Sequence, residues 1–195
     1  MNLREPNSLI GKHVRLEPLQ PVHFDELCKV GLDEDLWRWF PVVVRSREEL
    51  IRWLEDALAD QRKGLALPFV IVHAQSGAAI GTSRFANIAS EHRRLEIGWT
   101  WIVRDWQRTA VNTETKYLML HHAFEHLHCV RVEFKTDSLN QRSRAALLRI
   151  GAIEEGTLRQ HMVTNSGRIR DSVYFSVVQS EWPAVKARLE EKLAR

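Results

Sequence analysis

The sequence predicts an α/β fold, with a mixed sheet of the α+β type that has about seven twisted strands and helices on its faces. Strand-like runs at 68–73, 78–87 and 93–103 follow one another closely, which is typical of antiparallel neighbours. A helical run then separates 93–103 from a further strand-like run at 130–136, as in a parallel crossover. Where the pairing changes, we expect the strands to splay and leave a ligand crevice.

The N-terminal third of the chain alternates strand and helix patterns. Residues 13–17 alternate as a short strand, and residues 21–30 are typical of a helix with a proline in its first turn. Ser46 and Glu49 match a capping box, and the apolar stripe that follows predicts an amphipathic helix. Residues 37–41 lie between these helices as an irregular aromatic segment.

The C-terminal half continues with helices and strands in turn. A long apolar stripe predicts a helix over 113–127, and a second helix over 140–150 ends at a glycine. Two strands follow at 153–162 and 170–178, and an amphipathic helix begins at Glu181. The sequence contains no internal repeat or linker, so we expect residues 1–195 to form a single domain.

Composition excludes several function classes. The chain is 44% hydrophobic and 27% charged, and no apolar run approaches the roughly 20 residues that span a membrane. The first six residues show no apolar leader, and Cys28 and Cys129 lie far apart in apolar contexts, so we expect a reducing, cytoplasmic setting. A dispersed net charge of +3, without interleaved aromatic and basic residues, argues against a nucleic-acid partner.

A histidine-rich segment invites a metal-site interpretation. His122 and His126 have the i, i+4 spacing of a chelating pair. The segment lacks the His-Glu-x-x-His order, and no third ligand is evident. A solvated helix face is the favoured interpretation, and we predict no metal.

The segment 107–112 lies between a predicted strand and a predicted helix. The first turn of a helix has unpaired N–H groups and the positive end of the helix dipole, so such a loop can bind an anion. A diphosphate there would indicate a nucleotide-like cofactor.

Several segments together resemble the GNAT superfamily of acetyl-CoA-dependent N-acetyltransferases, in its RimJ/RimL-like branch. They are 96–99, 107–112, 139–143 and 148–152, and the likeness covers almost the whole chain. The resemblance implies direct transfer of an acetyl group from acetyl-CoA to a primary amine. A non-catalytic acyl-CoA-binding protein on the same fold is the alternative, because the family's loop carries Gly where this chain has Ala110.

The resemblance also implies which residues hold the cofactor. The backbone of residues 101–103 would pair with the pantetheine arm and offer an N–H to the thioester oxygen. The loop would hold the diphosphate, and the start of the helix at 140–150 would hold the pantetheine and approach the sulfur. The expected contacts are Trp101, Ile102, Val103, Gln107, Arg108, Thr109, Ala110, Val111, Asn112, Asn140 and Ser143.

Two residues are candidates for catalysis. Strand alternation places Leu95, Ile97, Trp99 and Trp101 on one face and Glu96 on the other, where the family often carries its base. The non-catalytic alternative is that Glu96 is a solvated or ion-paired surface glutamate. Ser143 is the candidate group beside the leaving thiolate.

Two further polar residues near the predicted cofactor site have structural alternatives. Helix capping is the alternative role for Asn140 and for Ser143. Tyr117 is a substitute acid that we expect to pack instead.

The acceptor site is predicted to have an aromatic wall that suits an apolar body or a cation. Its members are Trp37, Trp39, Phe40, Phe85 and Trp99. The acceptor itself is either a peptide N-terminus or a small-molecule amine. The late hairpin at 153–178 could exchange edges between two copies, so a homodimer is left open.

Overall fold

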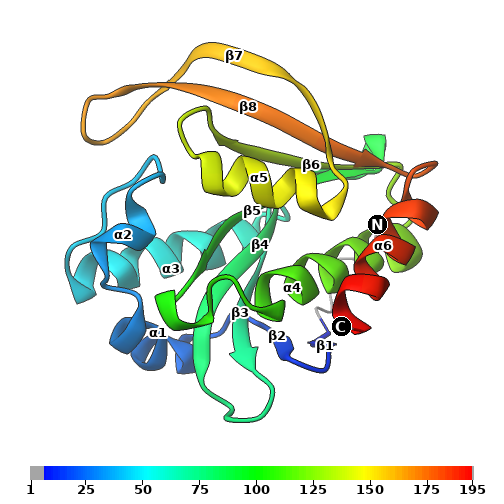
Figure 1. The fold of residues 1–195 in the computed structure, drawn as a ribbon. Helices are drawn as coiled ribbons and strands as arrows, with labels where there is room; N and C mark the ends of the chain where they lie inside the picture. The colour runs from blue at the N-terminus through cyan, green and yellow to red at the C-terminus, as the bar shows by residue number, and fades with distance from the viewer. Residues whose placement is uncertain (1–6, 195) are drawn as a thin grey trace.

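A computed structural model describes residues 7–194, and the expectation about a leader at residues 1–6 lies outside this range. Figure 1 shows one open sheet with helices on its faces, which confirms the predicted mixed α/β class. Eight strands are described, in the order β1-β2-β3-β4-β5-β6-β8-β7. They are β1 (Leu9–Ile10), β2 (Val14–Pro18), β3 (Leu67–His73), β4 (Ala79–Ala89), β5 (Arg94–Ile102), β6 (Arg131–Asp137), β7 (Ile153–Val163) and β8 (Ile169–Val178).

The α-helices are α1 (Phe24–Val30), α2 (Glu34–Trp37), α3 (Arg47–Arg62), α4 (Ala110–His121), α5 (Gln141–Ile150) and α6 (Trp182–Ala194). Single 3-10 turns lie at Pro21–His23, Ser90–His92 and Arg104–Trp106, and α4 continues into a π-helical turn at His122–His126. Over the described range, no helix is both long and apolar enough to cross a membrane.

Every pair of neighbouring strands is antiparallel except β5 and β6, which are parallel. The predicted run of three antiparallel strands followed by a crossover is therefore confirmed. The sequence missed β1 and α2, which have two and four residues, because elements this short leave no periodic pattern.

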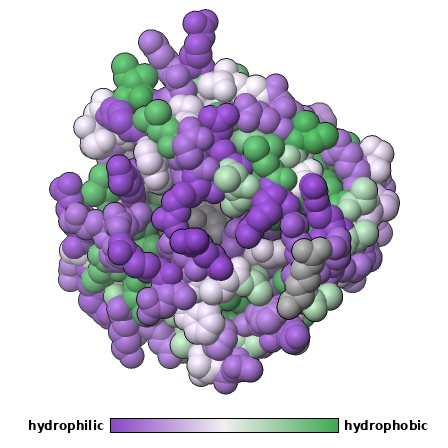
Figure 2. Space-filling model, in the orientation of Figure 1, coloured by the Kyte–Doolittle hydropathy of each residue, from purple (hydrophilic) through white to green (hydrophobic). Residues whose placement is uncertain are grey.

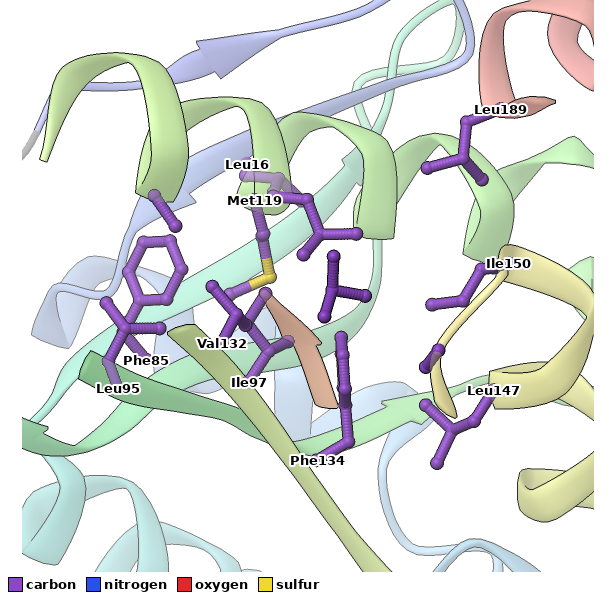
Figure 3. Packing of buried hydrophobic residues seen from close by; sticks show 14 of the residues in the cluster. Leu16, Phe85, Leu95, Ile97, Met119, Val132, Phe134, Leu147, Ile150 and Leu189 are labelled. Carbon is purple, nitrogen blue, oxygen red and sulfur yellow. The ribbon is translucent and has the colours of Figure 1, made fainter. Parts of the chain in front are cut away.

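The two faces of the sheet carry separate apolar cores. On one face α4, α5 and α6 pack on residues such as Leu95, Ile97 and Phe134; Figure 3 shows Ile97 beside Met119 of α4. On the other face α1, α2 and α3 pack against β3 and the end of β5. In the described range, the helices of the second face therefore pack over β3, β4 and β5.

One buried carboxylate of α4 hydrogen-bonds to the backbone of residues 12–14, at the start of β2. Glu114 accepts hydrogen bonds from the backbone N–H groups of Lys12, His13 and Val14, at 2.9, 2.6 and 2.8 Å. Charge-assisted hydrogen bonds of this kind are stronger than neutral ones. A β-carbon on Gly11 would lie 2.5 Å from the Glu114 carboxyl carbon, so glycine leaves the space that the carboxylate fills.

Candidate active site

The candidate site lies where β5 and β6 separate. The two strands pair only between Arg94–Glu96 and Arg131–Glu133, although β5 continues to Ile102 and β6 to Asp137. Among the described strands, none pairs with this edge of β5 beyond Glu96. Figure 2 shows a hollow near the centre of the molecule, bordered mostly by hydrophilic residues, in the part of the view where Figure 1 shows β5 between α4 and α5.

A bulge in β5 overturns the expected alternation of its side chains. The register with β4 shifts between Thr82 and Arg84, and Trp99 has a positive φ of 53°. A bulge inserts one residue and reverses the faces of the residues that follow. Leu95 and Ile97 stay in the core under α4, whereas Trp99 and Trp101 join the cluster on the opposite face. The prediction that these four residues share one face was therefore wrong.

Glu96 is buried on the face that the two tryptophans reach. Its side chain is 4% exposed, so it is not a solvated surface glutamate. Its Oε2 atom accepts a 2.8 Å hydrogen bond from Asn87 and lies 3.5 Å from the Lys135 ammonium. A β-carbon on Gly98 would lie 2.8 Å from Oε1, so glycine keeps room for this oxygen.

The loop after β5 leads directly into α4. The Thr109 hydroxyl caps the helix by accepting a 3.2 Å hydrogen bond from the Val111 N–H. Ala110 is the first helical residue and is absent from the positive-φ positions, so its methyl group is tolerated as expected. The left-handed position of the loop is Arg108, with φ of 64°. The helix thus starts at Ala110, three residues earlier than predicted.

Gln107 connects this loop to two neighbouring elements. Its Nε2 donates a 2.7 Å hydrogen bond to the Ile102 carbonyl, and its Oε1 accepts from the Arg142 guanidinium of α5. Arg142, which sequence reasoning did not single out, therefore joins the elements around the start of α4. The Val103 N–H donates to the Ile80 carbonyl at 2.9 Å, so it is not available as a donor to a thioester.

Asn140 caps α5, as its structural alternative predicted. Its Oδ1 accepts a 3.0 Å hydrogen bond from the Ser143 N–H. Ser143 is partly buried in the first turn of α5. Tyr117 donates to Glu190 of α6 at 2.9 Å, and burial together with this glutamate raises its pKa to about 12. The expectation that Tyr117 packs is confirmed.

An aromatic cluster lies on the Glu96 face, under α2 and α3. The Trp37 ring lies 5.0 Å from Trp53 and 5.1 Å from Phe40, measured between centroids, and Trp99 lies 6.0 Å from Phe40. Trp53 was predicted only as part of a helix stripe. A cavity of about 180 Å³ borders the cluster and reaches the β7–β8 loop; its lining includes Trp37, Phe40, Thr164, Ser166 and Arg168.

Phe85 does not belong to this wall, contrary to the prediction. It is fully buried on the opposite face, where it packs edge-on against Phe69 at 5.8 Å and lies beside Leu95 in Figure 3. Its strand partner is Ile97, so it follows the core face of the sheet. Trp39 makes no ring contact with the cluster among the described residues; its ring lies 5.2 Å from the Arg38 guanidinium and 5.9 Å from that of Arg168.

The histidine-rich segment is solvated only in part, because His126 is exposed whereas His122 is half-buried and stacks on Phe85 at 6.0 Å. The His122 and His126 rings lie 5.4 Å apart. Burial, with the neighbouring histidines, lowers the pKa of His122 to about 4. In the described part of the chain, no group of three His, Cys, Asp or Glu side chains is arranged to hold a metal ion.

Comparison with known proteins identifies the fold around this site. Residues 13–153 match the family model described as Acetyltransferase (GNAT) domain. This chain belongs to the GNAT acetyltransferase family. The resemblance found in the sequence is thereby confirmed, and the chain is an N-acetyltransferase by family.

Individual relatives agree with this assignment. The chain is 33% identical to the protein named Putative ribosomal N-acetyltransferase YdaF of Bacillus subtilis, over 91% of this chain and 97% of that protein. A GCN5-related N-acetyltransferase from Brucella melitensis superposes with a TM-score of 0.89 at 33% identity, over 97% of this chain and 86% of that one. Mycobacterium smegmatis RimJ, solved with CoA-disulfide, shares the fold at 24% identity and a TM-score of 0.80, over 92% and 88% of the two chains.

Proposed function

We propose that this chain transfers the acetyl group of acetyl-CoA directly to a primary amine. The observation that carries the proposal is the end of the β5–β6 ladder at Glu96, because one unpaired strand edge and one buried carboxylate meet there. A pantetheine arm carries amide groups that can pair with an unpaired strand edge. The start of α4, on the loop that follows β5, offers backbone N–H groups to the diphosphate.

The proposed chemistry begins with removal of a proton from the acceptor ammonium. Glu96, directly or through one water, takes this proton, and the neutral amine attacks the thioester carbonyl. The carbon–sulfur bond then breaks as the CoA thiolate leaves, and the nitrogen releases its second proton to solvent to give the neutral amide. The proton that the thiolate takes up comes from the Ser143 hydroxyl or from solvent.

The protein orients the base through one of its two oxygens. Oε2 of Glu96 receives the contacts from Asn87 and Lys135, whereas no described residue donates a hydrogen bond to Oε1. Oε1 is therefore the oxygen that we assign to the amine or its bridging water.

The word ribosomal in the name of the Bacillus subtilis relative supports a protein amine as the acceptor, and we assign the N-terminal amine of that protein; a small-molecule amine is the other candidate. A cytoplasmic setting remains a prediction, based on two cysteines that are both buried. A homodimer also remains a prediction. β7 ends the sheet, and Ile153, Leu158 and Val163 are exposed on it.

Thiol release tests the proposal. The protein is incubated with acetyl-CoA and a panel of amines, including ribosomal-protein N-terminal peptides, and products are checked for a mass increase of one acetyl group. Thiol release that depends on an amine supports the enzyme. Saturable acetyl-CoA binding without release on any amine would favour the acyl-CoA-binding alternative.

A further inference from the structure

Arg84 is a buried cation, and its close partners among residues 7–194 are aromatic rings. Its side chain is 6% exposed, and its guanidinium carbon lies 4.4 Å from the centroid of Trp53 and 4.8 Å from that of Trp99. No described residue accepts a hydrogen bond from its guanidinium, and no described carboxylate lies within ion-pair distance. Asp56 and Asp60 of α3 act on it only from further away.

This environment is costly for an arginine. A guanidinium has five N–H donors, and a buried arginine is normally paired with acceptors. Aromatic rings attract its charge but give its N–H groups no strong acceptor. Burial lowers the pKa of Arg84 to about 10, so the group still carries its charge at neutral pH. The guanidinium is therefore a charged group whose N–H donors have no acceptor among the described residues.

The strand register puts Arg84 on the same face of the sheet as the candidate base. Arg84 lies opposite Gly98, and Ala86 lies opposite Glu96. Arg84 and Glu96 are thus diagonal neighbours on adjacent strands, a relation in which the residues are typically about 7–8 Å apart and their β-carbons somewhat closer. Phe85 between them points into the other core.

We propose that Arg84 receives a carboxylate of the acceptor molecule. The inference rests on the proposed function and names its substrate class: a primary amine that carries a carboxylate, either on a small amino acid or on an acidic residue next to a peptide N-terminus. The planar guanidinium fork matches a carboxylate with two parallel hydrogen bonds. The faces of Trp53 and Trp99 already hold a cation, so the earlier expectation of a cationic acceptor over a ring is not favoured.

Two matched ligand pairs test this inference by calorimetry on the CoA-bound protein. The first pair is two peptides that differ only in having Asp or Asn as the second residue. The second pair is a free amino acid and its amide. We expect the carboxylate member of one pair to bind roughly tenfold to hundredfold more tightly. Arg84→Met should abolish this preference, and Arg84→Lys, which keeps the charge but loses the fork, should weaken it. Arg52→Met, an exposed arginine on α3, is the control.

Binding separates this inference from the proposed function. A carboxylate preference that depends on Arg84, without acetyl transfer to the same ligands, would retain the inference and remove the proposed reaction. Equal binding within both pairs, or a preference that survives in Arg84→Met, would overturn the inference. If Arg84→Met does not fold, the Arg84→Lys variant is used instead. A ratio of carboxylate to amide affinity equal to that of the native protein would then overturn the inference.

Discussion

The side-chain amide of Asn87 donates a 2.8 Å hydrogen bond to Oε2 of Glu96. Lys135 reaches the same oxygen from β6, at 3.5 Å. Contacts to a single oxygen fix the orientation of a carboxylate and leave the other oxygen free to act on a proton. Pre-oriented groups of this kind are what general base catalysis needs.

Glu96→Gln should lower turnover while leaving acetyl-CoA affinity nearly unchanged. Glutamine keeps the hydrogen-bonding shape but cannot accept the amine proton, so we expect kcat to fall by about 10²-fold or more. Initial rates of thiol release from pH 6 to 9 measure the loss, with exposed Glu91→Gln as the matched control. Unchanged rates across this range would remove Glu96 as the base.

Gly98→Ala should disturb the base without disturbing the fold. The added methyl group would lie 2.8 Å from Oε1 of Glu96, so the flexible carboxylate must move. Misplacement of a reacting group by about 1 Å costs on the order of 10²-fold, and we expect kcat to fall tenfold to a hundredfold. Calorimetry should find acetyl-CoA affinity within about threefold of the native protein, and a native kcat would contradict the assigned geometry.

Glu114→Gln should destabilise the protein, because the charged acceptor of three backbone N–H groups is lost. We expect a loss of about 2–4 kcal/mol in the free energy of unfolding. Urea titration measures this difference, with Glu91→Gln as the exposed reference. A loss no larger than that of the reference would show that the contact to β1 and β2 contributes little.

Lys116→Met should stabilise the protein at neutral pH. Lys116 is 7% exposed. Its ammonium donates a 2.8 Å hydrogen bond to the Thr100 hydroxyl, and no described carboxylate lies within ion-pair distance of it. Burial lowers its pKa to about 7, against about 10.4 in an unfolded chain. We expect a gain on the order of 1–3 kcal/mol at pH 7 for the methionine variant.

The pH dependence of this effect has a defined sign. Between pH 7 and about 10.4 the unfolded chain binds more protons at Lys116 than the folded chain does, so the stability of the native protein rises with pH in this window. The advantage of Lys116→Met should therefore shrink as pH approaches 10. Urea unfolding at pH 7 and pH 10, with exposed Lys29→Met as control, measures it; a constant difference would contradict the burial argument.

The spacing of apolar residues was sufficient to predict the long helices and strands of this fold. Strands β3 to β6 and the crossover helix follow from alternation and helical spacing, and they place the change of pairing at β5. The loop that we propose for the diphosphate was chosen because a strand, a short polar segment and a helix adjoin in the sequence. Whether this loop tolerates Ala110 in place of glycine depends on the φ angle at that residue, which cannot be read from the sequence.

The composition of the acceptor face could not be predicted from alternation. One extra residue at Trp99 reversed the faces beyond it, and a non-glycine residue with positive φ gives no sequence signal. Phe85 was assigned to the wrong face because aromatic residues near the crevice were grouped by type. With Phe85 on the wrong face, Arg84 was missed as well, because neighbouring residues on a strand face opposite sides.

A crystal structure of the protein with acetyl-CoA tests the account most directly. The account predicts the diphosphate at the N–H groups that begin α4, the pantetheine arm along the unpaired edge of β5, and the thioester on the side of Glu96 Oε1. Cofactor density away from the β5–β6 gap, or a thioester on the face that carries Phe85, would contradict it.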